Sequence, residues 1–328
     1  MRVLITGGAG FIGSHLCDAL LERGDQVDII DDLSTGKFEN ISRLLDNPKF
    51  RFVDDSVLNE KMMYLLIERC DIIYHLAAAV GVQLIVDEPV RTIETNIRGT
   101  EIVLNLAKKF RKKVLLASTS EIYGKSTHVP FKEEDDRLLG STIYSRWSYS
   151  TSKAVDEFLG LAYAKQYQLP VVITRFFNTV GPRQTGQYGM VIPRFTEAAL
   201  QNRPLRVFGS GKQTRCFGYV GDVVRAIIAL MEKKEAEGEI FNVGSDQEIS
   251  IADLAEKIIR LTGSQSEIKY ISYEEAYGQP FDDMERRVPS LDKISRTIGY
   301  HPEVDLEELL MKVIEYSRQK MKAEGQIP

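Results

Sequence analysis

The sequence predicts an α/β fold, a doubly wound parallel sheet with a smaller C-terminal α/β lobe. Up to residue 177, short apolar or β-branched runs alternate with longer helical patterns, as in successive βαβ units. The alternation then weakens in a loop rich in Gly, Pro and Gln at 178–193, and amphipathic helical patterns follow it. We therefore expect a first domain over 1–177, joined by a returning segment near 216–243, and a second lobe over 178–328.

The first predicted unit consists of "RVLIT" (2–6), the helical segment "FIGSHLCDALLERG" (11–24) and "QVDIID" (26–31). Its two strand candidates are short and rich in Val and Ile, whereas apolar residues in the helical segment recur at helical spacing. The same reasoning predicts further strands at 50–54, 71–77, 113–119 and 170–176. It predicts further helices at 98–110, 152–167, 249–263 and 305–321.

Composition limits the kinds of partner. The 328 residues carry a formal net charge of -5 with both signs interspersed, which argues against a nucleic-acid partner. No run approaches the roughly 18 uninterrupted apolar residues of a membrane span. Cys17, Cys70 and Cys216 are too widely spaced for a metal site or a disulfide framework, so we expect a cytoplasmic protein. We expect the acidic run at 132–136 to be a solvated loop, and we expect no metal.

A glycine pattern indicates a dinucleotide site. In "LITGGAGFIGSHL", Gly7 would allow a tight turn, Gly10 a close approach of the backbone to a pyrophosphate, and Gly13 close packing of helix on strand. The phosphates would lie at a helix N-terminus, where unpaired N–H groups and the helix dipole favour anions. The flanking strand and helix candidates supply the context that this fingerprint requires.

The second strand candidate ends in Asp31 and Asp32, about 20 residues after the glycines, as the fingerprint requires. A carboxylate there can accept hydrogen bonds from an adenosine ribose and would repel a 2′-phosphate. We therefore expect NAD rather than NADP, although Lys37 follows closely and leaves NADP open.

The segment "YSTSK" places Tyr149 and Lys153 four residues apart, on one face of a helix. An ammonium beside the phenol would stabilise the phenolate and lower a pKa that is about 10 unperturbed. Such a tyrosine can take a proton from a sugar hydroxyl while hydride passes to a nicotinamide. Together with the glycine pattern, the pair predicts an oxidoreductase-type step.

With these residues the sequence resembles the extended short-chain dehydrogenase/reductase family, and within it the nucleotide-sugar epimerases, dehydratases and decarboxylases. The motifs cover nearly the whole chain: "TGGAGFIGSHL", "HLAA", "NIRGT", "STSEIYG", "YSTSK", "RFFNTVGPRQ", "GSGKQTRCFGYVGDVVRAI", "FNVGS" and "RRVPSLDK". The resemblance implies a Rossmann-type first domain that binds NAD, a second lobe that closes over a UDP-sugar, and a homodimer. The dimer would form through 98–110 and 152–167.

The resemblance also assigns roles to single residues. Tyr149 would be the catalytic acid/base, Lys153 its partner and a ligand of the nicotinamide ribose, and Thr119 a hydrogen-bond partner of the reacting hydroxyl. The position of His75 in an apolar stretch favours a structural histidine, or a contact of its loop backbone with the cofactor, over catalysis. The other expected cofactor contacts are Gly7, Gly10, Phe11, Ile12, Gly13, Asp31, Asp32, Asp55 and Ala77. The expected substrate-binding residues are Asn178, Arg183, Arg215 and Arg287, and two of these, Arg215 and Arg287, would neutralise the diphosphate.

The reaction class depends on the triplet Thr119–Ser120–Glu121. Glucose-type dehydratases resemble it but carry Asp where this chain has Ser120, and simple epimerases lack the glutamate. The triplet looks like that of the UDP-glucuronate decarboxylases, so we expect decarboxylation of UDP-glucuronate to UDP-xylose or the 4-keto pentose. All three residues would be catalytic, with Thr119 in the oxidation step and Glu121 at the C5–C6 end of the 4-keto sugar. A 4-epimerase remains the main alternative, because 77–82 and 176–195 resemble that group. A dehydratase, an NAD-binding regulator and a purely structural Glu121 paired with a cation also remain open.

Overall fold

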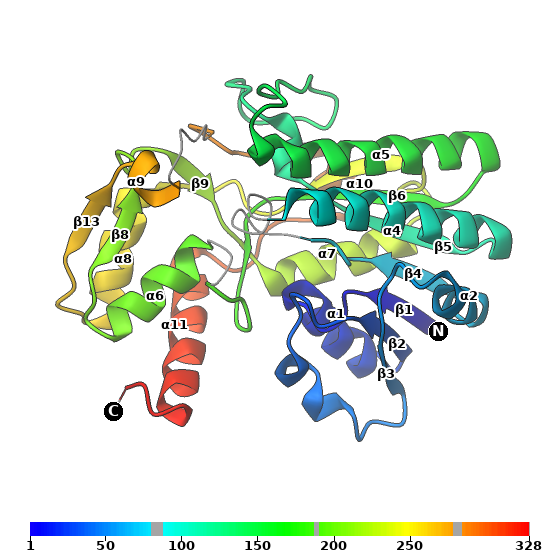
Figure 1. The fold of residues 1–328 in the computed structure, drawn as a ribbon, viewed down its shortest axis with the longest axis horizontal. Helices are drawn as coiled ribbons and strands as arrows, with labels where there is room; N and C mark the ends of the chain where they lie inside the picture. The colour runs from blue at the N-terminus through cyan, green and yellow to red at the C-terminus, as the bar shows by residue number, and fades with distance from the viewer. Residues whose placement is uncertain (80–87, 187–189, 278–283, 328) are drawn as a thin grey trace.

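The computed structural model describes residues 1–79, 88–186, 190–277 and 284–327. Its centre is a parallel sheet of seven strands in the order β11-β6-β5-β4-β1-β2-β3. From β1 the chain adds β2 and β3 on one side of the sheet. It then returns to place β4 on the other side of β1, which makes a doubly wound sheet (Figure 1). The strands are β1 Arg2–Thr6, β2 Gln26–Asp31, β3 Phe50–Asp54, β4 Ile72–His75, β5 Lys113–Thr119, β6 Val171–Phe176 and β11 Glu239–Val243.

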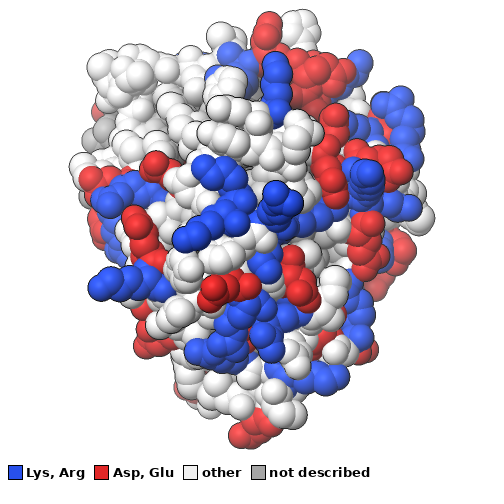
Figure 2. All heavy atoms as spheres, turned by 90° about the vertical axis from the view of Figure 1, so that its right-hand side faces the viewer, with Lys and Arg blue, Asp and Glu red and all other residues white. Residues whose placement is uncertain are grey.

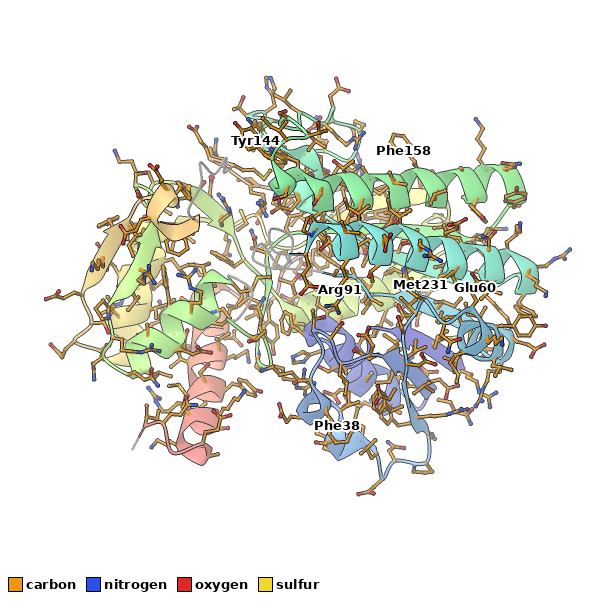
Figure 3. All side chains as sticks on the ribbon, in the orientation of Figure 1. Phe38, Glu60, Arg91, Tyr144, Phe158 and Met231 are labelled. Atoms are coloured by element: carbon orange, nitrogen blue, oxygen red, sulfur yellow. The ribbon has the colours of Figure 1, made fainter. Side chains whose placement is uncertain are left out.

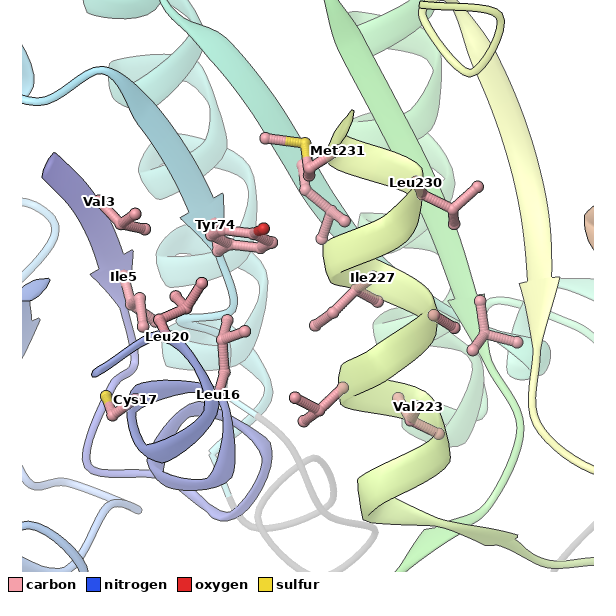
Figure 4. Close-up of a cluster of buried hydrophobic side chains, with 14 of the residues drawn as sticks. Val3, Ile5, Leu16, Cys17, Leu20, Tyr74, Val223, Ile227, Leu230 and Met231 are labelled. Carbon is pink, nitrogen blue, oxygen red and sulfur yellow. The ribbon is translucent and has the colours of Figure 1, made fainter. Parts of the chain in front are cut away.

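Helices cover both faces of this sheet. One face packs on α1 (Phe11–Glu22), α7 (Val220–Glu232) and α10 (Asp292–Ile298), and the other on α2 (Glu60–Arg69), α4 (Pro89–Phe110) and α5 (Ser148–Tyr167). Figure 4 shows the first of these cores, where Ile227 of α7 faces Leu16 and Leu20 of α1 beside Tyr74. Both faces of the strands are therefore buried, which accounts for their nearly continuous apolar character.

The second lobe has its own core. Helices α6 (Val191–Leu200), α8 (Ile251–Thr262) and α11 (Leu306–Ala323) pack against the parallel pair β8 (Leu205–Phe208) and β13 (Ile268–Ile271). Short pairs join it to the first domain: β9 (Thr214–Cys216) with β12 (Glu248–Ser250), and β7 (Thr179–Val180) with β10 (Gly218–Tyr219). A short helix, α9 (Tyr273–Tyr277), follows β13.

The predicted fold class is confirmed, and five of the six predicted strands differ from the observed ones by no more than one residue at either end. The exception is the strand predicted at 71–77, because β4 ends at His75. Two predicted helices begin too late: α4 starts at Pro89 rather than 98, and α5 at Ser148 rather than 152. The first turns of both are rich in polar residues, so apolar periodicity marks only their later part. Segment 239–243 pairs with β6 in the same sheet as the first domain.

Helix α4, with 22 residues, is the longest helix of the described residues. None of the helices in that part of the chain is both long and apolar enough to cross a bilayer. On the face shown in Figure 2, basic and acidic side chains are interspersed rather than gathered into an area of one sign.

Candidate active site

A cavity of about 520 Å³ lies where the carboxyl ends of the central strands meet the second lobe. Sheets of this kind bind their ligands at that edge, near the point where the strand order reverses. Lys153 is the one predicted site residue that does not line the cavity. The predicted residues that do line it are Gly7, Gly10, Phe11, Ile12, Gly13, Asp31, Asp32, Asp55, Ala77, Thr119, Ser120, Glu121, Tyr149, Asn178, Arg183, Arg215 and Arg287.

The glycine loop adopts its conformation only because two of its residues lack side chains. Gly7 has a φ of +73°, and a Cβ there would lie 2.8 Å from the Ala77 backbone nitrogen. A Cβ on Gly13 would lie 2.2 Å from the Gly7 carbonyl oxygen, so this glycine lets α1 pack against the turn. Helix α1 then begins at Phe11 and presents its N-terminus at the cavity, as a pyrophosphate site requires. The residues present therefore fit a dinucleotide.

The two aspartates after β2 differ in their surroundings. Asp31 is buried, and its carboxylate accepts hydrogen bonds of 2.9 Å from the backbone N–H groups of Ala9 and Leu33, which fixes the glycine loop to β2. Burial raises the pKa of Asp31, and these hydrogen bonds act against that rise. Asp32 is exposed and accepts one hydrogen bond, of 3.0 Å, from the Ser34 backbone. Asp32 is thus the more accessible carboxylate for a ribose.

Tyr149 of α5 interacts with Thr119, the last residue of β5. Burial raises the pKa of Tyr149, the carboxylates of Glu121 and Asp156 raise it further, and a hydrogen bond with the Thr119 side chain lowers it. Lys153 donates to Asp156 over 2.7 Å, and both side chains are buried. The predicted lowering of the tyrosine pKa by Lys153 is therefore wrong for the protein chain by itself, because the carboxylate of Asp156 engages the ammonium.

His75 has partners on both ring nitrogens. Nδ1 lies 2.8 Å from the Thr6 hydroxyl and Nε2 lies 3.2 Å from the Thr100 hydroxyl. Burial first and then the Lys153 charge lower its pKa to about 3, so the ring stays neutral. These bonds agree with the structural role that we expected for it.

Glu121 lies in a single 3₁₀ turn, Ser120–Tyr123, directly after β5. Its backbone N–H donates to the Thr119 hydroxyl over 3.2 Å. Its carboxylate accepts from the Arg287 guanidinium over 2.7 Å, and the two side chains are only 13% and 8% exposed. Arg287, expected at the diphosphate, thus contacts the acidic residue of the triplet.

The remaining expected substrate residues lie on the cavity wall. Asn178 donates to the Cys216 carbonyl over 2.9 Å, and Arg215 donates to the Thr214 carbonyl over 2.8 Å. Arg183 reaches across to α1, where it forms an ion pair of 2.7 Å with Asp18. Arg183 therefore connects the second lobe to the helix behind the glycine loop.

A buried polar network below the triplet was not predicted from the sequence. Ser118 donates to Glu157 over 2.6 Å, and Glu157 accepts two hydrogen bonds from Arg175, of 2.9 and 2.8 Å. Arg175 also donates to the Tyr123 hydroxyl over 2.8 Å, and that hydroxyl donates to Asn242 over 2.8 Å. An arginine inside the apolar strand "VVITRF" is the sequence signal that could have indicated this network.

The acidic run at 132–136 contributes to the same network, so the expectation of a wholly solvated loop is wrong. Glu133 accepts from the Asn242 backbone N–H over 2.8 Å, and its own carbonyl accepts from Arg175 over 2.9 Å.

The described residues contain no group of His, Cys, Asp and Glu that could hold a metal ion. Residues 80–82 and 187–189, within two motifs that resemble the epimerases, lie outside the described residues.

A dinucleotide cradle, a pair formed by Tyr149 of α5 and Thr119 of β5, and a second lobe closing the same cavity define an NAD-dependent enzyme of the short-chain dehydrogenase/reductase type. The chain belongs to the family described as GDP-mannose 4,6 dehydratase, which matches residues 4–313. This agrees with the resemblance read from its motifs.

Two relatives and one solved structure illustrate the similarity. The chain is 46% identical to a UDP-N-acetyl-alpha-D-glucosaminuronate decarboxylase of Bacillus cytotoxicus, over 97% of this chain and 98% of that protein. It is 38% identical to UDP-glucuronic acid decarboxylase 1 of Xenopus tropicalis, over 98% of this chain and 73% of that protein. Its fold is similar to UDP-glucuronic acid 4-epimerase of Bacillus cereus in complex with UDP-glucuronic acid and NAD, with a TM-score of 0.88, 31% identity and coverage of 98% and 100%.

Proposed function

We propose that this enzyme decarboxylates a UDP-uronate through a 4-keto intermediate, with UDP-glucuronate and its 2-acetamido counterpart as the candidate substrates. The observation that carries the proposal is the Glu121–Arg287 pair beside Tyr149 and Thr119. Two decarboxylases of UDP-uronates among the relatives, 46% and 38% identical, support it.

The proposed reaction begins with oxidation at C4 and continues with cleavage of the C5–C6 bond. When bound, NAD supplies the hydride acceptor for C4 and brings a positive charge that opposes the carboxylates near Tyr149. Tyr149 takes the proton of the C4 hydroxyl, with Thr119 as its hydrogen-bond partner, so that C4 becomes a ketone. The C6 carboxylate is then β to that ketone.

In the second step the C5–C6 bond breaks, its electron pair enters the C4–C5 enolate, and carbon dioxide leaves. C5 would then take a proton from solvent, and Tyr149 would return its proton to the C4 oxygen as the cofactor supplies the hydride that reduces C4. Arg287 is a cation that can hold the uronate carboxylate, and Glu121 places a second negative charge beside it. Loss of neutral carbon dioxide relieves that repulsion, which gives Glu121 a role that a simple epimerase does not need.

The test is to incubate the NAD-loaded enzyme with UDP-glucuronate, its 2-acetamido counterpart and UDP-glucose, and to measure carbon dioxide and product stereochemistry. We expect carbon dioxide from at least one uronate. A uronate that returns only its C4 epimer, with no carbon dioxide, would replace this proposal by the 4-epimerase, which the likeness to the Bacillus cereus epimerase favours as the second candidate.

Glu121→Gln is the matched variant for this proposal, because it keeps the size of the side chain and removes its charge. We expect carbon dioxide release to fall by about tenfold or more, as for loss of one positioned catalytic group. Unchanged release would mean that Glu121 only supports Arg287.

We further propose a cytoplasmic homodimer formed through α4 and α5. Phe158 of α5 is 64% exposed and Val90 of α4 is 68% exposed, and Figure 3 shows Phe158 projecting from the outer side of its helix. Among the other apolar residues of α5, Leu159 and Leu161 pack instead on the core beneath the helix, and Val155 is half-buried. Light scattering should give a dimer mass, and Phe158→Glu should yield monomers; an unchanged mass would exclude this interface.

A further inference from the structure

The segment that carries Glu121 is anchored immediately after it. Tyr123, two residues later in the same turn, is fully buried and accepts from Arg175 and donates to Asn242, each over 2.8 Å. Its ring stacks on Phe131, with centroids 4.5 Å apart and planes 10° apart. The hydrogen bonds and the ring stacking of Tyr123 therefore fix the end of the turn that carries Glu121.

The segment that carries Arg287 is anchored to the same group of residues. The Phe131 backbone N–H donates to the Val288 carbonyl over 2.8 Å, and the Ser290 N–H donates to the Phe131 carbonyl over 2.7 Å. The Asn242 side-chain amide donates to the Phe131 carbonyl over 2.9 Å and to the Ser290 carbonyl over 3.4 Å. Chain positions one to three residues beyond Arg287 are thus tied to the residues that hold Tyr123.

We name Tyr123, Phe131, Asn242 and Ser290 the Asn242 hub. All four are buried, and Asn242 has no exposed surface. The hub rests on the bidentate Arg175–Glu157 ion pair, whose side chains are 5% and 7% exposed. Buried polar groups that are fully hydrogen-bonded make a local arrangement rigid and specific. A small displacement of the hub residues should therefore displace both the segment of Glu121 and the segment of Arg287.

We propose that Tyr123 and Asn242 are positioning residues that hold Glu121 and Arg287 in register for carbon–carbon bond cleavage. The inference rests on the proposed function, because it concerns the step that follows oxidation at C4. Tyr149 and Thr119, which act in the oxidation, interact with each other outside the hub. Loss of a hub hydrogen bond should therefore slow decarboxylation much more than oxidation.

The test is Tyr123→Phe, which keeps the stacked ring and removes only the hydroxyl with its two hydrogen bonds. NAD-loaded enzyme is mixed rapidly with the uronate that the wild type decarboxylates, and NADH absorbance at 340 nm and carbon dioxide are followed in one turnover. We expect NADH to form within about threefold of the wild-type rate, while carbon dioxide appears on the order of tenfold to a hundredfold more slowly, as for a displacement of about 1 Å. Bound NADH should then accumulate.

The matched control is Tyr300→Phe, which also removes a buried tyrosine hydroxyl, in this case one that donates to the Gly244 carbonyl over 2.7 Å. We expect its two rates to keep the wild-type ratio even if its thermal midpoint falls as far. Asn242→Ala removes the partner of the Tyr123 hydroxyl from the other side, and it is the second variant if the first does not fold.

Equal slowing of NADH and carbon dioxide in the hub variants, or no slowing of either, would overturn the positioning role. A wild-type enzyme that releases no carbon dioxide from either uronate would overturn the proposed function, and the inference with it. The wild-type measurement therefore separates the two failures.

Discussion

The Arg175–Glu157 ion pair offers a direct test of what supports the active-site end of β5. Glu157 accepts from Arg175 over 2.9 and 2.8 Å and from the Ser118 hydroxyl over 2.6 Å. Glu157→Gln keeps the side-chain size and one acceptor oxygen but removes the negative charge. It leaves the Arg175 guanidinium, whose side chain is 5% exposed, buried without a counter-charge.

Breaking a buried ion pair by changing one partner costs about 3–5 kcal/mol of unfolding free energy. Since 1.4 kcal/mol is tenfold, the ratio of folded to unfolded protein should fall by roughly two to four powers of ten. Removing both charges is often nearly neutral, because neither ion then has to be desolvated. Arg175→Met combined with Glu157→Gln should therefore be clearly more stable than the sum of the two single losses predicts.

Urea unfolding followed by fluorescence measures these differences. The single tryptophan, Trp147, is buried directly before α5 and reports on this region. A free energy of unfolding for Glu157→Gln within about 1 kcal/mol of the wild type would refute the reasoning, since it would place the pair among weak surface pairs. Strict additivity of the two single variants would refute it as well, because it would mean that the two charges do not interact.

Three other predictions concern the cofactor and the tyrosine. Gly13→Ala places a Cβ 2.2 Å from the Gly7 carbonyl oxygen, so NAD affinity in a calorimetric titration should fall about tenfold or more, and an unchanged affinity would contradict the role of this glycine. Asp156→Asn removes a negative charge that raises the pKa of Tyr149, so the acid limb of the kcat profile should move to lower pH; a fixed limb would exclude this influence. Asp32→Ala removes the exposed carboxylate after β2, so the ratio of NAD to NADP affinities should fall; a constant ratio would assign the discrimination elsewhere.

The fold could be predicted from the sequence because its signals are local. Each central strand is a short apolar run, and the carboxyl ends of parallel strands meet at one edge, so residues such as Gly7 and Thr119 could be expected around one cavity. Lys153 shows where spacing alone fails. Tyr149 lies four residues before it and Asp156 three residues after it, so both can share its helix face. Only the structure shows that the ammonium bonds Asp156, to which it is attracted by charge.

The buried network could not be predicted in this way, because its partners are far apart in the sequence. Tyr123 and Asn242 are separated by 119 residues, and Arg175 and Glu157 come from different elements on opposite sides of a loop. Sequence patterns identify which strand is buried but not which charged residue will meet which. The sequence indicates only that a charged residue within a buried strand, such as Arg175, needs a partner. It does not indicate which residue that partner is.

The Glu121–Arg287 pair reconciles two interpretations of Glu121 that had been alternatives. In one interpretation Glu121 only balances the charge of Arg287, and in the other it acts on the substrate. The two roles exclude each other only if the substrate carries no charge at C6. A uronate does carry one, so its carboxylate would compete with Glu121 for the single guanidinium of Arg287. Binding energy from the diphosphate can offset that competition. Cleavage of the C5–C6 bond would then remove the carboxylate charge from beside Glu121. A neutral hexose has no such charge to lose. Under the proposed function, the same contact that balances Arg287 in the protein chain would favour loss of the carboxylate from a bound uronate.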